Sequence, residues 1–133
     1  MAINQNKGKM EMEKMFEFLK PDFENIDDRG ELKQLYSKSC KQVNYSFSKK
    51  GTFRGNHYHK INKEIFYIIS GKIEICFQKG EEKETVVVKN GDLFQIFPFT
   101  LHSFNFLENT QMIVIYDKGV VLNNNEKDIY NGK

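Results

Sequence analysis

The chain has 133 residues, of which 29% are charged and 39% hydrophobic, and this length suits one domain with a single core. No apolar run approaches the roughly 20 residues of a membrane-spanning helix, and the first residues lack the apolar stretch of a signal peptide. These features argue against a membrane protein and predict a soluble cytoplasmic one. Cys40 and Cys76 are too few and too far apart for a disulfide framework, so we expect reduced thiols.

The net charge of +2 conceals an uneven distribution along the chain. Residues 1–31 and residues 64–133 each carry a net charge of −3, whereas residues 32–63 hold eight basic residues and no acidic ones. Such a segment is either a solvated basic face or part of a site for an anionic ligand. The sequence pI near 8.4 and the absence of nucleic-acid-binding motifs argue against DNA or RNA as a partner.

The N-terminal residues show a helical pattern that Pro21 ends. Apolar residues recur there at loosely helical spacing, with glutamate and lysine between them: Met10, Met12, Met15, Phe16 and Leu19. We therefore predict one short helix, packed on the domain or on a partner subunit. The acidic and glycine-containing residues 27–30 that follow are typical of a turn.

The rest of the chain has the pattern of β-strands. We expect strands at residues 42–48, 65–69, 72–77, 85–88, 92–97, 101–106 and 111–116. In the first of these, Val43, Tyr45 and Phe47 alternate with polar residues, which is typical of a strand with one buried face. Seven or eight short strands at this spacing predict an all-β sandwich or barrel of the jelly-roll kind.

The histidines provide the first chemical signal. His57 and His59 are two residues apart, and residues at that spacing in a strand project from the same face. Glu64 begins the next expected strand, and His102 lies 43 residues after His59. A lone histidine is more often an ordinary core residue, but this combination favours one shared pocket. Three imidazoles and a carboxylate suit Zn²⁺, Fe²⁺, Mn²⁺ or Ni²⁺, with coordination positions left for a substrate.

The spacing of these residues resembles the first signature of the cupin family. It reads Gly-x5-His-x-His-x4-Glu-x6-Gly from Gly51 to Gly71 and matches in every position. Residues 91–102 resemble the second signature, because Gly91 and His102 stand at the usual separation of eleven, although Pro98 is one place late. The resemblance implies a cupin jelly-roll barrel with a metal held by the histidines and the glutamate.

The resemblance covers about residues 43–116 and divides the chain into three parts. We expect an N-terminal helical extension (residues 1–26), a cupin domain (residues 27–120) and a polar, loose C-terminal tail (residues 121–133). Small cupins expose sheet edges and large apolar faces, so we also expect a homodimer.

A narrower resemblance lies in residues 28–32, Asp-Arg-Gly-Glu-Leu, and residues 54–60, Arg-Gly-Asn-His-Tyr-His-Lys. Similar segments occur in keto-rhamnose 3,5-epimerases, in deoxysugar 3,4-ketoisomerases and in the C-terminal cupin domain of capsular polysaccharide-assembling reductases. The match to the last group extends furthest, because Glu64 and the Ser-Gly of residues 70–71 also recur there. The resemblance implies an epimerase or ketoisomerase that acts on a nucleotide-diphospho-4-keto-6-deoxy sugar in surface polysaccharide synthesis.

Isomerisation next to a ketone requires a base and a group that stabilises the enolate. His57 is the expected base, with a pKa near neutrality, and His59 or a bound metal would polarise the keto oxygen. Tyr45 or Tyr67 would return the proton, although tyrosines on such strands are more often core or rim residues. Strand parity turns Tyr58 away from the two histidines.

The diphosphate of such a substrate needs cationic partners. Arg54 has the planar guanidinium that suits phosphate oxygens, and Lys60 and Arg29 are further candidates. Phe97 would stack on the nucleotide base or fill the barrel. We expect no organic cofactor. Two other functions stay open: an iron-dependent dioxygenase that uses the same four ligands, and a non-catalytic sugar-binding module.

Overall fold

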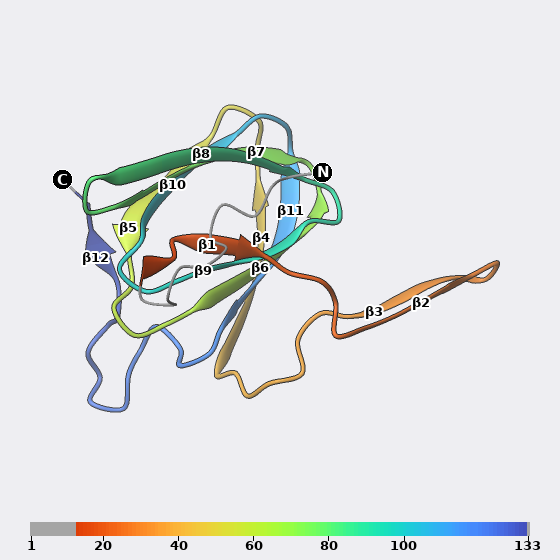
Figure 1. Ribbon diagram of the computed structural model, residues 1–133, viewed down its shortest axis with the longest axis horizontal. Helices are drawn as coiled ribbons and strands as arrows, with labels where there is room; N and C mark the ends of the chain where they lie inside the picture. Colours follow the sequence, from red (N-terminus) through yellow and green to blue (C-terminus); the bar gives the residue numbers. More distant parts are fainter. Residues whose placement is uncertain (1–12, 133) are drawn as a thin grey trace.

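The computed structural model describes residues 13–132, and this part of the chain contains strands and no α-helix (Figure 1). The strands are β1 (Phe16–Phe18), β2 (Phe23–Asp27), β3 (Gly30–Gln34), β4 (Gln42–Ser48), β5 (Phe53–Tyr58), β6 (Glu64–Ser70), β7 (Lys72–Lys79), β8 (Glu82–Lys89), β9 (Leu93–Ile96), β10 (Leu101–Phe106), β11 (Thr110–Tyr116) and β12 (Tyr130–Asn131). No helix among these residues is long and apolar enough to cross a membrane.

Two antiparallel sheets of five strands each enclose the core (Figure 1). Sheet A has the order β1-β9-β6-β11-β4, and sheet B has the order β12-β5-β10-β7-β8. The predicted all-β class is confirmed, and each of the seven expected strand regions overlaps an observed strand. The alternation of side chains that predicted these strands follows from the pleat, which turns successive residues to opposite faces.

The predicted N-terminal helix is wrong in its described part, which forms β1 instead. This strand pairs antiparallel with β9 and completes sheet A. Met15 and Phe16 are both buried, and the Phe16 ring stacks on Phe77 with centroids 4.5 Å apart. Burial against the sheet outweighs the weak helical periodicity of so short a segment. Met10 and Met12, which belonged to the same pattern, lie outside the described residues.

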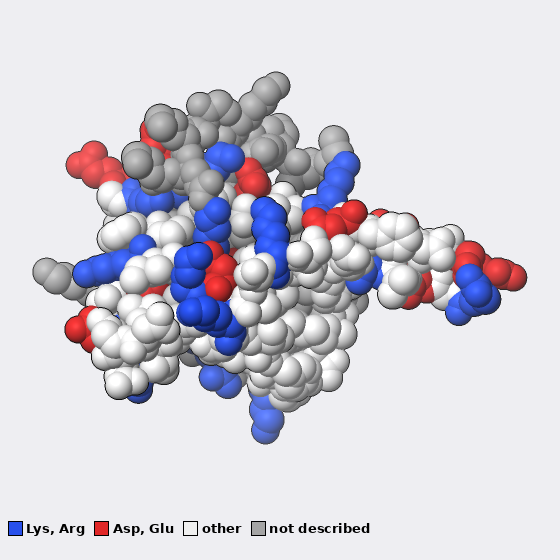
Figure 2. Space-filling view, turned by 90° about the horizontal axis from the view of Figure 1, so that it is seen from below, with Lys and Arg blue, Asp and Glu red and all other residues white. Residues whose placement is uncertain are grey.

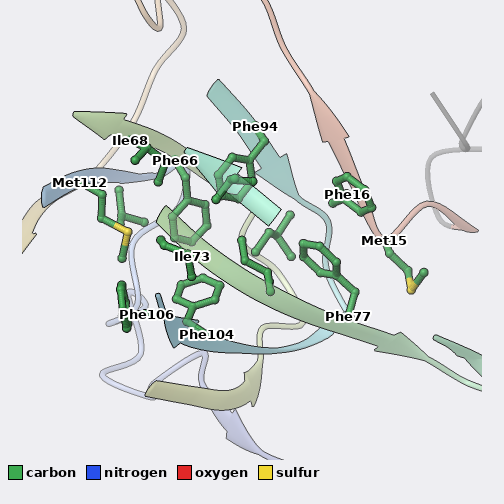
Figure 3. Close-up of a cluster of buried hydrophobic side chains, with 14 residues drawn as sticks. Met15, Phe16, Phe66, Ile68, Ile73, Phe77, Phe94, Phe104, Phe106 and Met112 are labelled. Carbon is green, nitrogen blue, oxygen red and sulfur yellow. The ribbon is translucent and has the colours of Figure 1, made fainter. Parts of the chain in front are cut away.

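Aromatic and β-branched side chains from both sheets form one core (Figure 3). Phe66 of β6 stacks on Phe94 of β9 at 5.0 Å between centroids and meets Phe104 of β10 edge-on at 5.5 Å. Full burial of such a side chain contributes roughly 1.5 to 3 kcal/mol. Phe66 and Phe104 also line a cavity, so the core forms part of the wall of the site described below.

The apolar residues of β4 point away from the core. Val43, Tyr45 and Phe47 are 61%, 61% and 46% exposed. Ser46, by contrast, lies directly opposite the buried Met112 of β11, and directly opposite residues share a face of the sheet. The alternation thus predicted the strand correctly, but its apolar face is the outer one. The inner face is polar because it lines a cavity.

Strands β2 and β3 form a hairpin that extends away from the two sheets (Figure 1). Its strands are joined at Asp28 and Arg29, in agreement with the predicted turn. Phe23, Ile26 and Leu32 are 52%, 64% and 61% exposed. Charged side chains of both signs lie at the tip of the hairpin (Figure 2), and Glu24 and Lys33 form a further pair nearer the body.

The C-terminal segment packs against the body, contrary to the expectation of a loose tail. Val121 forms a β-bridge with Lys127, and β12 pairs with β5 at the edge of sheet B. Asp128 is completely buried. Strands from the first and last parts of the chain therefore complete sheets A and B.

Candidate functional site

A one-residue bulge in β5 sets the geometry of the site. Gly55 pairs with Ser103 and His57 pairs with His102, so Asn56 is the extra residue between them. The φ angles of Gly55 and Asn56 are 98° and 62°, a region that glycine and asparagine tolerate best. A Cβ atom on Gly55 would lie 2.9 Å from the His102 carbonyl oxygen. This close approach requires glycine, and it brings two histidines side by side.

The bulge also places Arg54 on the same face as His57. Residues three apart in a regular strand face opposite sides, but the extra residue restores a common side. Arg54 lies opposite Phe104, whose side chain is buried. Its Nε donates a hydrogen bond to Ser48 Oγ at 2.9 Å. Arg54 and His57 consequently border the same cavity.

The structure brings together the four residues expected to bind metal. His57 comes from β5, His59 from the loop after it, Glu64 from the start of β6 and His102 from β10. One potential ligand atom of each lies within 4.8 Å of the others. Glu64 Oε1 is 3.1 Å from His59 Nε2 and 3.2 Å from His102 Nε2. These last three residues are buried, whereas His57 is half-buried.

The hydrogen bonds of the two buried imidazoles favour a bound cation. His59 Nδ1 faces the Asp128 carbonyl oxygen, and His102 Nδ1 faces the Thr100 carbonyl oxygen at 2.9 Å. Because a carbonyl oxygen only accepts, each Nδ1 carries a proton, and Nε2 of each ring is the nitrogen turned toward Glu64. Within the described residues, His59 Nε2 and Glu64 Oε1 have no hydrogen-bond partner of suitable geometry. A divalent metal fits this donor set.

Burial and mutual proximity shift the pKa values of His57, His59 and Glu64. Burial lowers the pKa of His57 to about 4, and the neighbouring His102 acts in the same direction. The expected near-neutral pKa is therefore wrong, and His57 is neutral at pH 7. Burial also opposes the charged form of His59, but the Glu64 carboxylate outweighs it and raises that pKa. Despite its burial, Glu64 has a pKa well below the usual range because His102 and His59 stabilise its charge.

A cavity of about 430 Å³ opens from this group between β4, β5, β6, β10 and β11. Glu64 and His102 border it beside His57. Apolar side chains from the core and the polar inner residues Asn44 and Ser46 of β4 form its walls. Its volume lies within the range of small-molecule sites and suits a sugar ring.

Three predicted residues do not point into the cavity. Tyr45 lies at its border, but its side chain is on the outer face of sheet A, where its hydroxyl oxygen accepts a hydrogen bond from Gln111 Nε2 at 3.0 Å. Tyr67 does not line the cavity, and its ring centroid is 5.9 Å from Lys33 Nζ. Phe97 is 4% exposed and fills space elsewhere in the fold.

Two predicted cationic residues also lie away from the cavity. Lys60 Nζ sits over the ring of Tyr130 at 4.2 Å. Arg29 lies at the tip of the hairpin and donates to Asp27 Oδ2 at 2.6 Å. Tyr58 stacks on Tyr130, and it does not line the cavity, as strand parity predicted. Of the eight basic residues within 32–63, all of them described, Arg54 is the one that borders the cavity.

Two residues of the site were not predicted from the sequence. Tyr116 lines the cavity next to His59, with ring centroids 5.8 Å apart. Burial raises the pKa of Tyr116 well above its usual range, and the charge of Glu64 adds to this effect. Tyr116 ends one of the expected strands, and the alternation of side chains along that strand could have indicated that it faces the interior. Asp128 contacts His59 from 69 residues away, and no sequence pattern indicates such a contact.

Residues 25–130 match the model of the family described as "Polysaccharide biosynthesis C-terminal domain". A comparison with curated protein sequences finds no match to the chain.

Solved structures of two sugar isomerases or epimerases and of a capsular polysaccharide assembling protein share the fold. A sugar 3,4-ketoisomerase from Thermoanaerobacterium thermosaccharolyticum, in complex with TDP, has a TM-score of 0.68 at 17% identity, over 78% of this chain and 81% of its own. A dTDP-6-deoxy-D-glucose-3,5-epimerase from Legionella pneumophila has a TM-score of 0.64 at 18% identity, over 77% and 66%. The capsular polysaccharide assembling protein from Staphylococcus aureus has a TM-score of 0.62 at 24% identity, over 84% of this chain and 34% of its own.

These similarities confirm the resemblance to the cupins, since the two antiparallel sheets are those of cupin-like structures. The family match spans most of the described residues, from β2 to the first residue of β12. The chain thus belongs to the family of polysaccharide biosynthesis C-terminal domains.

Proposed function

We propose that the protein is an isomerase, either an epimerase or a 3,4-ketoisomerase, for a nucleotide-diphospho-4-keto-6-deoxy sugar used in surface polysaccharide synthesis. The observation that carries the proposal is that one cavity is bordered by a neutral histidine, a buried histidine–carboxylate group and an arginine. The similar structures support the substrate class, because one was solved with TDP and another with dTDP-4-keto-L-rhamnose.

His57 acts as the base in this proposal. It is neutral and half-buried, so its imidazole can take a proton from the carbon next to the ketone. The Tyr116 hydroxyl, whose pKa is raised, stays protonated and can return a proton to the opposite face of that carbon or to the neighbouring one. Arg54 holds the diphosphate at the edge of the cavity.

The three buried residues His59, Glu64 and His102 have a different role from His57, the base. His59 and His102 both present Nε2 to Glu64 Oε1, so these three residues would hold one divalent metal such as Zn²⁺, Fe²⁺, Mn²⁺ or Ni²⁺. A bound metal supplies a Lewis acid that polarises the keto oxygen. His57, the fourth member of the predicted ligand set, borders the cavity and in this proposal keeps its free nitrogen for the substrate proton.

Proton exchange with the solvent tests this proposal directly. The metal-loaded protein is incubated with TDP- and UDP-linked 4-keto-6-deoxy sugars in D₂O, and NMR follows deuterium at C3 and C5. We expect incorporation with at least one sugar, and the His57→Asn variant should lose it by about 100-fold or more while keeping its circular dichroism spectrum. Retained exchange in this variant would place the base elsewhere.

The same donor set favours a second candidate, an iron-dependent dioxygenase, because three histidines and one carboxylate also suit Fe²⁺. Oxygen consumption by the iron-loaded protein, without deuterium incorporation into any sugar, would favour the dioxygenase. Binding of a nucleotide sugar with neither reaction would instead indicate a non-catalytic sugar-binding module.

The exposed apolar surfaces support a homodimer as the working assembly. The outer face of β4 carries three exposed apolar side chains, and the hairpin carries three more. A two-stranded hairpin is marginally stable by itself in water, so cover from a second copy of the chain would stabilise it. The hairpin and β4 are consecutive in the chain and are joined by the loop of residues 35–41 (Figure 1).

A further inference from the structure

The loop between β5 and β6 carries His59, and one buried carboxylate holds it in place. The Asp128 side chain accepts hydrogen bonds from the backbone N–H groups of Lys60, Ile61 and Asn62 at 2.8, 3.1 and 2.9 Å. Asp128 itself is completely buried. Three consecutive N–H groups pointed at one carboxylate leave the loop little freedom to change conformation.

Asn62 fastens the same loop to the segment that follows β11. Its Nδ2 donates to Asp128 Oδ2 and to the Gly119 carbonyl oxygen, both at 2.8 Å. Its Oδ1 accepts from the Lys118 backbone N–H at 3.0 Å. The loop and the C-terminal segment therefore form one closed hydrogen-bond network, and Asn62 is itself 1% exposed.

The main chain of Asp128 makes the decisive contact. Its carbonyl oxygen accepts the hydrogen bond from His59 Nδ1, so the residue that fixes the loop also fixes the ring. This bond keeps a proton on Nδ1 and turns Nε2 toward Glu64, so that Nε2 is the nitrogen available to a metal.

We propose that Asp128 is a positioning residue that sets the tautomer and orientation of His59 for metal binding. The inference rests on the metal-binding part of the proposed function and is independent of the reaction. It predicts that the C-terminal segment determines metal affinity, although it supplies no ligand atom of its own.

The tautomer of His59 in the metal-free, full-length protein gives the first test, and it needs no variant. The ¹⁵N chemical shifts of the ring should show a protonated Nδ1, the nitrogen that faces the Asp128 carbonyl oxygen. A ring protonated on Nε2 alone would overturn the proposal.

Metal affinity gives the second test, with Gln42→Ala as a matched control. Gln42 Oε1 accepts from the Val120 N–H at 2.8 Å and so anchors the same segment without touching the loop of His59. Calorimetric titration with Zn²⁺ should show a loss of about 10- to 100-fold in affinity for Asp128→Ala and little change for Gln42→Ala. Equal losses of Zn²⁺ affinity in both variants would show that Asp128 has only a structural role.

Two further outcomes are an Asp128→Ala variant that does not fold and a wild-type protein that binds no metal. If Asp128→Ala does not fold, Asp128→Asn takes its place, since it keeps the size of the side chain but turns one oxygen into a donor. If the wild-type protein binds none of Zn²⁺, Fe²⁺, Mn²⁺ and Ni²⁺ but shows the expected tautomer, the metal part of the proposed function fails. The hydrogen bond from His59 to Asp128 would then stand, but its role in metal binding would be overturned.

Discussion

Tyr45 and Tyr116 lie on the neighbouring strands β4 and β11 but serve different faces of sheet A. The Tyr45 hydroxyl is bound by Gln111 on the outer face, whereas Tyr116 reaches Glu64 beside the cavity. Tyr116→Phe should therefore lower product formation by about 100-fold or more, because no hydroxyl returns the proton. Deuterium exchange by His57 should persist in this variant.

Tyr45→Phe is the matched control for that experiment, and its progress curves by NMR should equal those of the wild-type protein. If the two variants behave alike, Tyr116 has no special part in the reaction.

The two cationic candidates nearest the first motif, Arg54 and Lys60, can be separated in the same way. Arg54 borders the cavity, whereas the Lys60 ammonium lies over the ring of Tyr130. Arg54→Ala should raise KM about 10-fold or more and change kcat less, because a phosphate contact remote from the reacting carbon contributes to binding. Steady-state kinetics of Lys60→Ala should show an unchanged KM. A raised KM in Lys60→Ala alone would reverse the assignment.

At the scale of the element, the bulge of β5 depends on glycine for two separate reasons. Gly55 and Gly51 both have positive φ angles, 98° and 87°, but a Cβ atom meets the His102 carbonyl oxygen only at Gly55. Gly51→Ala should cost about 1 kcal/mol of the free energy of unfolding, which is the cost of the backbone conformation. Gly55→Ala should cost about 2 to 4 kcal/mol, because the backbone of β10 must also move.

Urea denaturation of the two variants measures this difference. Since β10 carries His102, Gly55→Ala should also weaken metal binding, whereas Gly51→Ala should not. Equal losses of stability in the two variants would show that a Cβ atom at position 55 is accommodated beside the His102 carbonyl oxygen without a further loss of free energy.

Strand positions were largely predictable because the pleat alternates side chains and β4, β7, β10 and β11 follow it. Which face of each strand points toward the interior was less predictable. Ser46 faces inward because a cavity, rather than core, lies behind it. Arg54 and His57 share a face through the extra residue Asn56, which simple alternation does not include. Asp128 was beyond prediction, since its partners lie 66 to 69 residues away.

At the scale of the whole molecule, the apolar outer surface predicts self-association. Phe47 on the outer face of β4 is 46% exposed and does not line the cavity. Phe47→Glu should convert a dimer to a monomer, because a charge buried in an apolar interface is costly. Sedimentation velocity measures the change.

Val87→Glu provides the control, since Val87 is 49% exposed on β8 of sheet B. This variant should keep the mass of the wild-type assembly. A wild-type protein that is monomeric at all concentrations would contradict the predicted dimer, and dissociation of Val87→Glu alone would move the interface to sheet B.

The two faces of β4 give a thermodynamic link between ligand and assembly. Asn44 and Ser46 line the cavity, and the alternating residues Val43, Tyr45 and Phe47 lie on the surface where a second copy is expected. A sugar that holds one face of a strand in a single conformation holds the other face as well, so occupancy would strengthen association. Reciprocity then requires that association strengthen the affinity for sugar by the same factor. The concentration of the protein would thereby help to determine how much substrate it binds.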